Sequence, residues 1–248
     1  MKRWLYIGGM LLVLIVIGIY LLFSNLNSIV KAAVEKIGSD VTQAQVKLKD
    51  VNIELTSGKG ALRGLTVGNP SGFKSDRALS LGEISLQVDV GSVTKDTVLI
   101  KEIVIAAPEV TYEIGTQGSN IDALKRNIGA YTGKGKQEKS SAESKEGGKK
   151  LVVEHLYIRK GKVNVVAAAL QQEKTATAAL PDIHLTNIGK ASGGATAAEL
   201  AEQVLTAIGQ GAAKAAASSE VTKLLGSKIG GASAGGGLGE SAKKLFGK

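Results

Sequence analysis

Few residues in this 248-residue sequence have the type and spacing that chemistry requires. Ser92 and Lys95 stand at the Ser-x-x-Lys spacing of a serine nucleophile and its lysine. The Ser-Asp-Asn and Lys-Thr-Gly elements that accompany this pair in serine acyl-enzymes are missing from the sequence. A turn that leads into a strand is therefore the better interpretation of this segment. The sequence has no cysteine, which excludes disulfides, thiolate metal ligands and cysteine nucleophiles.

The remaining titratable residues do not form a catalytic or metal-binding set either. With only two histidines, His155 and His184, a histidine-based site is not expected, and we predict that both lie exposed on strands. The carboxylates alternate with apolar residues, as on the solvated face of a sheet; they are Glu54, Glu83, Asp89, Glu102, Glu109 and Glu113. We therefore predict that the protein is not an enzyme and that it has no catalytic residue, no metal and no cofactor.

The net charge of +9 raises the question of nucleic-acid binding. The excess of positive charge comes from the extreme N-terminus, residues 124–150 and residues 219–248, and the rest of the chain is close to neutral. Nucleic-acid binders usually present their charge on a folded face or interleave it with aromatic residues that stack on bases. Aromatic residues are only 4% of this sequence, so we expect no nucleic-acid partner.

The segment from Trp4 to Phe23 is predicted to cross a membrane. Its twenty residues carry no charge and would form a helix of roughly 30 Å, the thickness of the hydrocarbon core of a bilayer. The run is longer than the apolar region of a cleaved signal peptide, and no small-x-small cleavage site follows it. Because Lys2 and Arg3 precede the span, the positive-inside rule places the N-terminus in the cytoplasm and the remainder across the membrane.

Most of the chain beyond the anchor has the two-residue period of β-strands, with one recurring irregularity. Six times, two apolar residues are separated by two positions where strict alternation would leave one. These interruptions follow Leu48, Leu62, Leu81, Ile100, Val153 and Leu180. An extra residue turns later side chains to the opposite face unless the strand bulges there. We therefore predict a row of antiparallel strands that share a bend, which curves the sheet.

Two stretches of the chain also resemble each other. Residues 98–112 align with residues 151–165 at a constant offset, and Pro108 stands opposite Gly161 at the turn between two strands. This weak internal repeat predicts that one strand–turn–strand unit is used twice.

Composition divides the chain into five segments. They are a transmembrane anchor (1–23), the first part of a periplasmic β domain (24–132), a flexible loop (133–150), the second part of the β domain (151–190) and an Ala- and Gly-rich helical C-terminal segment (191–248). Short amphipathic helices are expected over residues 29–37 and 195–217, the second beginning with a capping box formed by Thr196 and Glu199. The fold class is therefore mainly β, with a transmembrane helix, a curved antiparallel sheet and a few short helices.

The anchor and two of the strand segments together resemble the AsmA-like envelope proteins. The resemblance rests on residues 46–73, of which 64–73 (GLTVGNPSGF) are the most specific, and on residues 98–114 (VLIKEIVIAAPEVTYEI). It implies an anchor in the inner membrane of a Gram-negative bacterium and a periplasmic sheet that curls into an apolar groove. It also implies a role in phospholipid movement and in the integrity of the outer membrane. About eight to ten strands, at roughly 4.8 Å each, are too few to bridge two membranes.

The sequence therefore predicts a non-enzymatic periplasmic protein that binds or transfers lipid and supports the outer membrane. A phospholipid or other acyl chain would lie along the concave face of the sheet, on Val51, Ile53, Leu65, Val67, Ile84, Leu86, Ile103, Ile105, Leu156 and Ile158. Alternatively, the helix over residues 195–217 closes that face into an ordinary core. A rival function is a structural or assembly partner that binds another envelope protein through a sheet edge.

Overall fold

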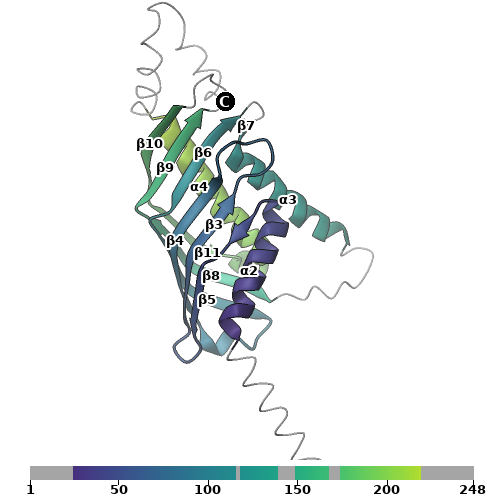
Figure 1. Cartoon of the computed structure of the whole chain (residues 1–248). Coiled ribbons are helices and arrows are strands. Elements are labelled where there is room, and N and C mark those ends of the chain that lie inside the picture. The colour runs from purple at the N-terminus through teal and green to yellow at the C-terminus, as the bar shows by residue number, and fades with distance from the viewer. Residues whose placement is uncertain (1–24, 116–117, 139–148, 168–173, 219–248) are drawn as a thin grey trace, which may run out of the picture.

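The fold is one curved sheet wrapped around three helices (Figure 1). The computed structural model describes residues 25–115, 118–138, 149–167 and 174–218. The helices are α2 (Leu26–Thr42), α3 (Asn120–Glu138) and α4 (Ala197–Ala216), with short 3-10 turns η1 (Val90–Ser92) and η2 (Lys190–Ser192). The strands are β1 (Val46–Lys47), β2 (Asp50–Glu54), β3 (Lys59–Gly68), β4 (Arg77–Val88), β5 (Thr97–Ala106), β6 (Glu109–Gly115), β7 (Gly118–Ser119), β8 (Lys150–Arg159), β9 (Gly161–Ala167), β10 (Lys174–Leu180) and β11 (Ile183–Ile188).

Several of these strands are the two halves of one longer, bent strand. β5 and β6 both run beside β4, with Ala106 opposite Glu83 and Glu109 opposite Ser80. The break between β5 and β6 falls at Ala107, whose φ of 46° is rare for a residue with a side chain. The β8–β9 break falls at Lys160, with a φ of 56°, and the β10–β11 break at residues 181–182. All three breaks lie along one line across the sheet, so the sheet turns a corner there.

The internal repeat is confirmed, but its two copies pair in parallel. β5 pairs with β8 and β6 pairs with β9, from Thr97 opposite Lys150 to Ile114 opposite Ala167, at the offset found in the sequence. Pro108 lies beside Gly161, where an added Cβ would stand 3.0 Å from the Pro108 ring. The prediction of an entirely antiparallel sheet is therefore wrong. Two parallel pairs occupy its centre because α3 lies in the connection between the copies and returns the chain to the same end of the sheet.

The irregularities in the alternation align across neighbouring strands. Gly64 of β3 and Gly82 of β4 lie between two regular cross-strand pairs, Arg63 with Glu83 and Leu65 with Leu81. The gap between β1 and β2 lies beside Gly64. In β5, β8 and β11 the irregular positions are Lys101, Glu154 and Asn187, which form a second line, level with the register shift between Gln87 and Val88 of β4. Because the strands of each line are irregular at the same level, their apolar residues stay on one face on both sides of it. The interruption after Leu180 differs, since it is the connection between β10 and β11.

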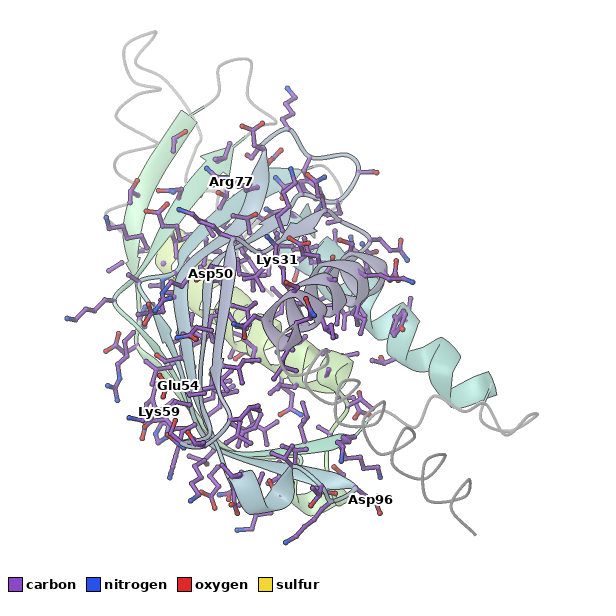
Figure 2. All side chains as sticks on the ribbon, turned by 60° about the horizontal axis from the view of Figure 1, so that its bottom comes forward. Lys31, Asp50, Glu54, Lys59, Arg77 and Asp96 are labelled. Carbon is purple, nitrogen blue, oxygen red and sulfur yellow. The ribbon has the colours of Figure 1, made fainter. Side chains whose placement is uncertain are left out.

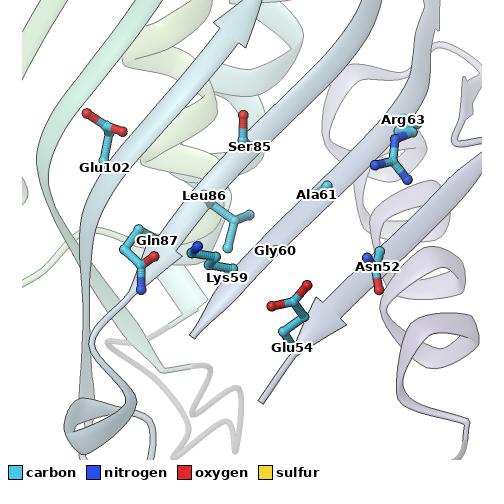
Figure 3. A pocket seen from close by; sticks show the side chains of 10 residues that line it. All are labelled: Asn52, Glu54, Lys59, Gly60, Ala61, Arg63, Ser85, Leu86, Gln87 and Glu102. Atoms are coloured by element: carbon cyan, nitrogen blue, oxygen red, sulfur yellow. The ribbon is translucent and has the colours of Figure 1, made fainter. Parts of the chain in front are cut away.

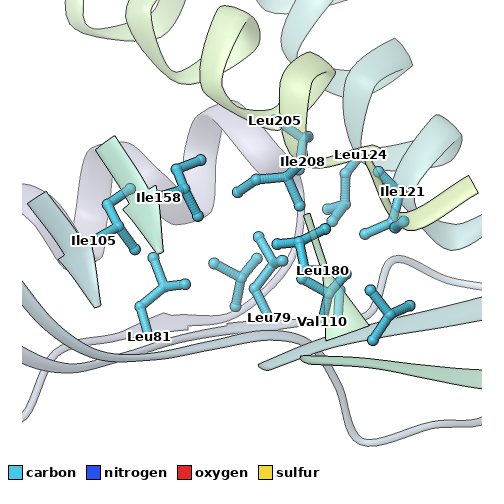
Figure 4. Close-up of a cluster of buried hydrophobic side chains, with 14 of the residues drawn as sticks. Leu79, Leu81, Ile105, Val110, Ile121, Leu124, Ile158, Leu180, Leu205 and Ile208 are labelled. Carbon is cyan, nitrogen blue, oxygen red and sulfur yellow. The ribbon is translucent and has the colours of Figure 1, made fainter. Parts of the chain in front are cut away.

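The three helices cover the concave side of the sheet. α2 packs against β1 and β2, α4 packs against β6 and β8–β11, and α3 contacts both helices. The best-buried side chains lie between α3, α4 and the sheet (Figure 4), where Val110, Ile121, Leu124 and Ile158 are fully buried and Ile208 nearly so. The helix over residues 195–217 therefore does close part of the concave face, as the alternative interpretation expected.

The helices differ from the sequence-based expectations in their extent. α2 continues past Gly38 to Thr42, where the Thr42 hydroxyl donates to the Gly38 carbonyl at 2.7 Å. α3 was not anticipated and runs six residues into the segment predicted as a loop over 133–150. α4 begins as predicted, with both hydrogen bonds of the Thr196–Glu199 capping box formed.

The predicted anchor, residues 1–23, lies outside the described residues, as do residues 139–148 and 219–248. None of the helices within the described ranges is long and apolar enough to cross a membrane.

Candidate functional site

The sheet brings eight of the ten predicted lipid-binding residues into two adjacent rows. Strand pairing places Val51, Ile84, Ile105 and Ile158 at one level, with Leu62 between the first two. The next level holds Ile53, Leu86, Ile103 and Leu156, with Gly60 between the first two. Neighbouring residues of a cross-strand row lie on the same face of a sheet. Leu65 and Val67 reach this face farther along β3, beyond the irregularity at Gly64.

Burial divides these ten residues into two groups. Seven are at most 8% exposed, namely Val51, Val67, Ile84, Ile103, Ile105, Leu156 and Ile158. The other three, Ile53, Leu65 and Leu86, are only half-buried. The first group belongs to the packed interior, so the second group is where an added acyl chain would find exposed apolar surface.

The half-buried residues lie in the part of the concave face between α2 and α4. Leu62, Leu65, Leu86 and Val88, all on β3 and β4, pack only partly against the core. α2 covers the neighbouring β1 and β2, while α4 covers strands on the far side of β4. The apolar residues of β3 and β4 are therefore covered only by neighbouring side chains, and part of their surface stays accessible to solvent.

The outer face of the same strands carries a shallow polar hollow of about 320 Å³ (Figure 3). Its charged lining residues are Glu54, Lys59, Arg63 and Glu102. The Arg63 guanidinium contacts Glu83 at 3.0 Å and Asp50 at 3.4 Å, and its hydrogen bond to Glu83 raises the pKa of Arg63. All three side chains are about half-exposed, so we treat these ion pairs as ordinary surface contacts.

The two histidines are exposed, as predicted, but they also touch each other. His155 Nδ1 and His184 Nε2 are 3.2 Å apart, on β8 and β11. Tyr157 stacks on the His184 ring at a centroid distance of 4.2 Å, and the Arg159 guanidinium lies 4.3 Å from the centre of the Tyr157 ring. Sequence reasoning missed this cluster because the pairing of β8 with β11 is not visible in the spacing of the residues.

Glu113 is the one carboxylate whose predicted position on a solvated face is wrong. It is 1% exposed, and its oxygens accept hydrogen bonds from the backbone N–H groups of Lys74 and Ser75, each at 2.8 Å. Burial alone raises the pKa of Glu113, but these donors, the Ser75 hydroxyl and the Lys74 charge outweigh it and lower the pKa.

Glu113 and its neighbours fasten the connection between β3 and β4, which contains residues 69–73. The Asn69 amide donates to the Ser75 carbonyl at 2.6 Å, and Asn120 donates from its amide to Asn69 Oδ1 at 2.7 Å. The backbone N–H of Glu113 donates to Asn120 Oδ1 at 3.0 Å. This network joins the β3–β4 connection to β6 and to the start of α3, so we read residues 64–73 as a structural element.

No catalytic arrangement emerges around Ser92. Its hydroxyl donates to the Asp89 carbonyl at 2.6 Å and accepts from the Leu99 backbone N–H at 2.8 Å. The hydroxyl therefore stabilises the turn before β5. In the part of the chain that the structure describes, no three residues of the metal-ligating types come together in a way that would hold an ion.

Comparison with protein-family models finds no match for this chain, and comparison with curated proteins finds no similar sequence.

Proposed function

We propose that this protein is a non-enzymatic lipid-binding or lipid-transfer protein of the bacterial envelope that supports the outer membrane. Residues 1–23 anchor it in the inner membrane with the N-terminus in the cytoplasm, and the folded part lies in the periplasm. A phospholipid acyl chain lies on the concave face of the sheet between α2 and α4, against Ile53, Leu65 and Leu86.

The observation that carries the proposal is the half-burial of a continuous apolar strip. Ile53, Leu62, Leu65, Leu86 and Val88 occupy neighbouring strands of one face, and none of them is fully covered. A water-exposed apolar strip on a protein is costly, and an acyl chain laid along it removes that surface from water. These residues follow one another along β3 and β4, with Ile53 beside them on β2, so the strip offers a chain-shaped surface and not a compact pocket.

The sequence adds two further reasons. The uncharged run from Trp4 to Phe23 ends just before α2, which keeps the concave face near the bilayer that supplies lipid. The resemblance of residues 46–73 and 98–114 to AsmA-like proteins points to the same class of ligand.

A second candidate function is assembly with another envelope protein through the edge of the sheet. β10 ends the order of strands, and its exposed residues Thr175, Thr177 and Ala179 carry no charge. Beyond Lys174, at the start of the strand, this edge lacks the charges that usually prevent the addition of another strand. This function needs no lipid cargo.

Substitutions on one strand test the lipid proposal. Leu86→Asp places a charge on the half-buried strip, where water can still reach it, so the full-length protein should fold normally and lose co-purifying lipid. Ser85→Asp, its neighbour on the exposed outer face, is the matched control and should keep its lipid. Circular dichroism and mass spectrometry of extracted lipids report the two properties. Absence of lipid from the wild type and from both folded variants would favour the assembly function, and equal, non-zero lipid content in the two variants would contradict the placement of the lipid against Leu86.

A further inference from the structure

Exposed apolar side chains gather at one end of the molecule. Six large apolar residues of the described chain are exposed by more than a third. Four of them lie at the end where α2 begins and β2 meets β3: Ile29, Leu55, Val90 and Val93, with exposed fractions of 44–48%. We call these four residues the apolar rim. The other two are Ile37, two turns farther along α2, and Tyr131 on α3.

Direct contacts hold the segments of the apolar rim together. The Asn27 side chain, in the first turn of α2, accepts a hydrogen bond from the backbone N–H of Ile53 at 3.2 Å, two residues before Leu55. The turn after Leu55 packs on η1 so tightly that a Cβ at Gly58 would stand 2.9 Å from a Val90 methyl group. Asp89 caps η1 through the Gly91 N–H at 3.1 Å. The apolar rim is therefore built on a defined surface and not on a frayed chain end.

The position of the apolar rim in the chain indicates what covers it. The uncharged segment 4–23 ends two residues before α2, so the end of the molecule at which α2 starts is the end nearest the proposed membrane anchor. Charged residues of both signs surround this end, among them Glu54, Lys59 and Asp96 (Figure 2). A strongly charged partner is therefore not favoured, while exposed Leu, Ile and Val side chains suit the boundary between headgroups and acyl chains.

We propose that the apolar rim is a second membrane contact, which rests in the surface of the bilayer that holds the anchor. Four side chains would bind a bilayer weakly by themselves. The anchor keeps them at a high effective concentration beside the membrane, so a weak contact suffices to orient the folded part. This inference rests on the anchor of the proposed function, but it does not require a lipid cargo.

The same contact gives the concave strip access to lipid. Leu55 follows Ile53 along the chain, and Val90 follows Val88, so the apolar rim continues the half-buried strip toward the bilayer. An acyl chain that leaves the membrane beside the apolar rim would reach the strip with little exposure to water.

The absence of cysteine from the sequence makes the apolar rim accessible to labelling. A single cysteine replaces Leu55, Val90 or Val93 in the full-length chain and is labelled with an environment-sensitive fluorophore. Each labelled protein is reconstituted into phosphatidylcholine vesicles with and without a lipid-attached quencher. Ile37→Cys controls for an apolar site of equal exposure, and Ser71→Cys, beyond the opposite end of β3, controls for distance. We expect a blue shift and quenching at the three rim positions and neither change at Ser71.

Three outcomes are informative. Quenching at the rim positions that exceeds quenching at Ile37 and Ser71 supports the contact, whether or not lipid is found on the concave strip. Protein that floats with the vesicles but shows no quenching at the rim overturns the contact and leaves the anchor intact. Protein that does not float with the vesicles overturns the anchor and, with it, the contact.

Discussion

The Glu113 carboxylate accepts the backbone N–H of Lys74 at 2.8 Å, across 39 residues of sequence. It accepts the Ser75 N–H at the same distance, so one buried charge holds the loop between β3 and β4 against β6. Buried backbone N–H groups that lose their acceptor are costly, and a buried charge without donors is more so. We therefore regard Glu113 as the main polar contribution to the stability of this end of the sheet.

Glu113→Gln should destabilise the fold by about 1–3 kcal/mol, because the amide offers one acceptor oxygen in place of two and turns a donor toward N–H groups. Chemical denaturation followed by circular dichroism measures the difference. Glu109→Gln is the control, since Glu109 is exposed on the same strand and should have almost no effect. Equal stability of the two variants would contradict the role given to Glu113.

The lowered pKa of Glu113 also predicts how stability depends on pH. Because the folded-state pKa lies below the unfolded value of roughly 4.3, the contribution of Glu113 is fully present above that pH. It is lost as the pH falls through the lower, folded-state pKa. The difference in unfolding free energy between wild type and Glu113→Gln should therefore shrink below about pH 4 and stay constant between pH 6 and 8. A difference that grows on acidification would contradict this sign.

Two glycines at the same level of the sheet should respond differently to alanine. Gly64 has a φ of 64°, and an added Cβ would stand 2.8 Å from the Lys49 Cβ, so Gly64→Ala should cost about 1–3 kcal/mol. Gly82 has an ordinary φ and open space around the Cβ position, so Gly82→Ala should be nearly neutral. Melting temperatures of the two variants provide the comparison. A similar loss for both would mean that the irregularity does not depend on the conformation of Gly64.

The proposed orientation in the membrane predicts the location of the C-terminus. A reporter enzyme that works only in the periplasm should be active when it is fused after Lys248, because Lys2 and Arg3 keep the N-terminus in the cytoplasm. A reporter that works only in the cytoplasm should be inactive at the same position. Moving Lys2 and Arg3 to the other side of the apolar run is the control and should lower periplasmic activity. Activity of a cytoplasm-dependent reporter on the unaltered chain would overturn both the orientation and the localisation.

The sequence predicts the faces of the strands better than their partners. Alternation places Ile84 and Ile105 on one face because side-chain direction is a local property of a strand. It does not encode that β5 and β8 run parallel, since that depends on α3, whose polar sequence after Tyr131 conceals the helix. Glu113 was misplaced for a similar reason. Its spacing matches a solvated face, and only the return of the loop at Lys74 and Ser75 buries it.

For the candidate site, too, the sequence predicts the face on which each residue lies but not how deeply the residue is buried. The ten apolar residues could be chosen from their spacing, and the pairing places them on one face. How deeply each is buried depends on where α2 and α4 cross that face. Ile103 and Leu86 are direct neighbours across β5 and β4, yet Ile103 is buried and Leu86 is only half-buried. Alternation alone cannot distinguish these two positions.

Photo-crosslinking in living cells tests most directly whether a lipid lies on the concave face. A photoreactive amino acid replaces Ile53, which is half-buried on the concave side of β2, in the full-length protein. The control replaces Asn52, its exposed neighbour on the outer side. After irradiation and purification, mass spectrometry identifies covalently attached lipid. The proposed function predicts lipid adducts at Ile53 and few or none at Asn52. Absence of adducts at Ile53, or equal amounts at both positions, would contradict it.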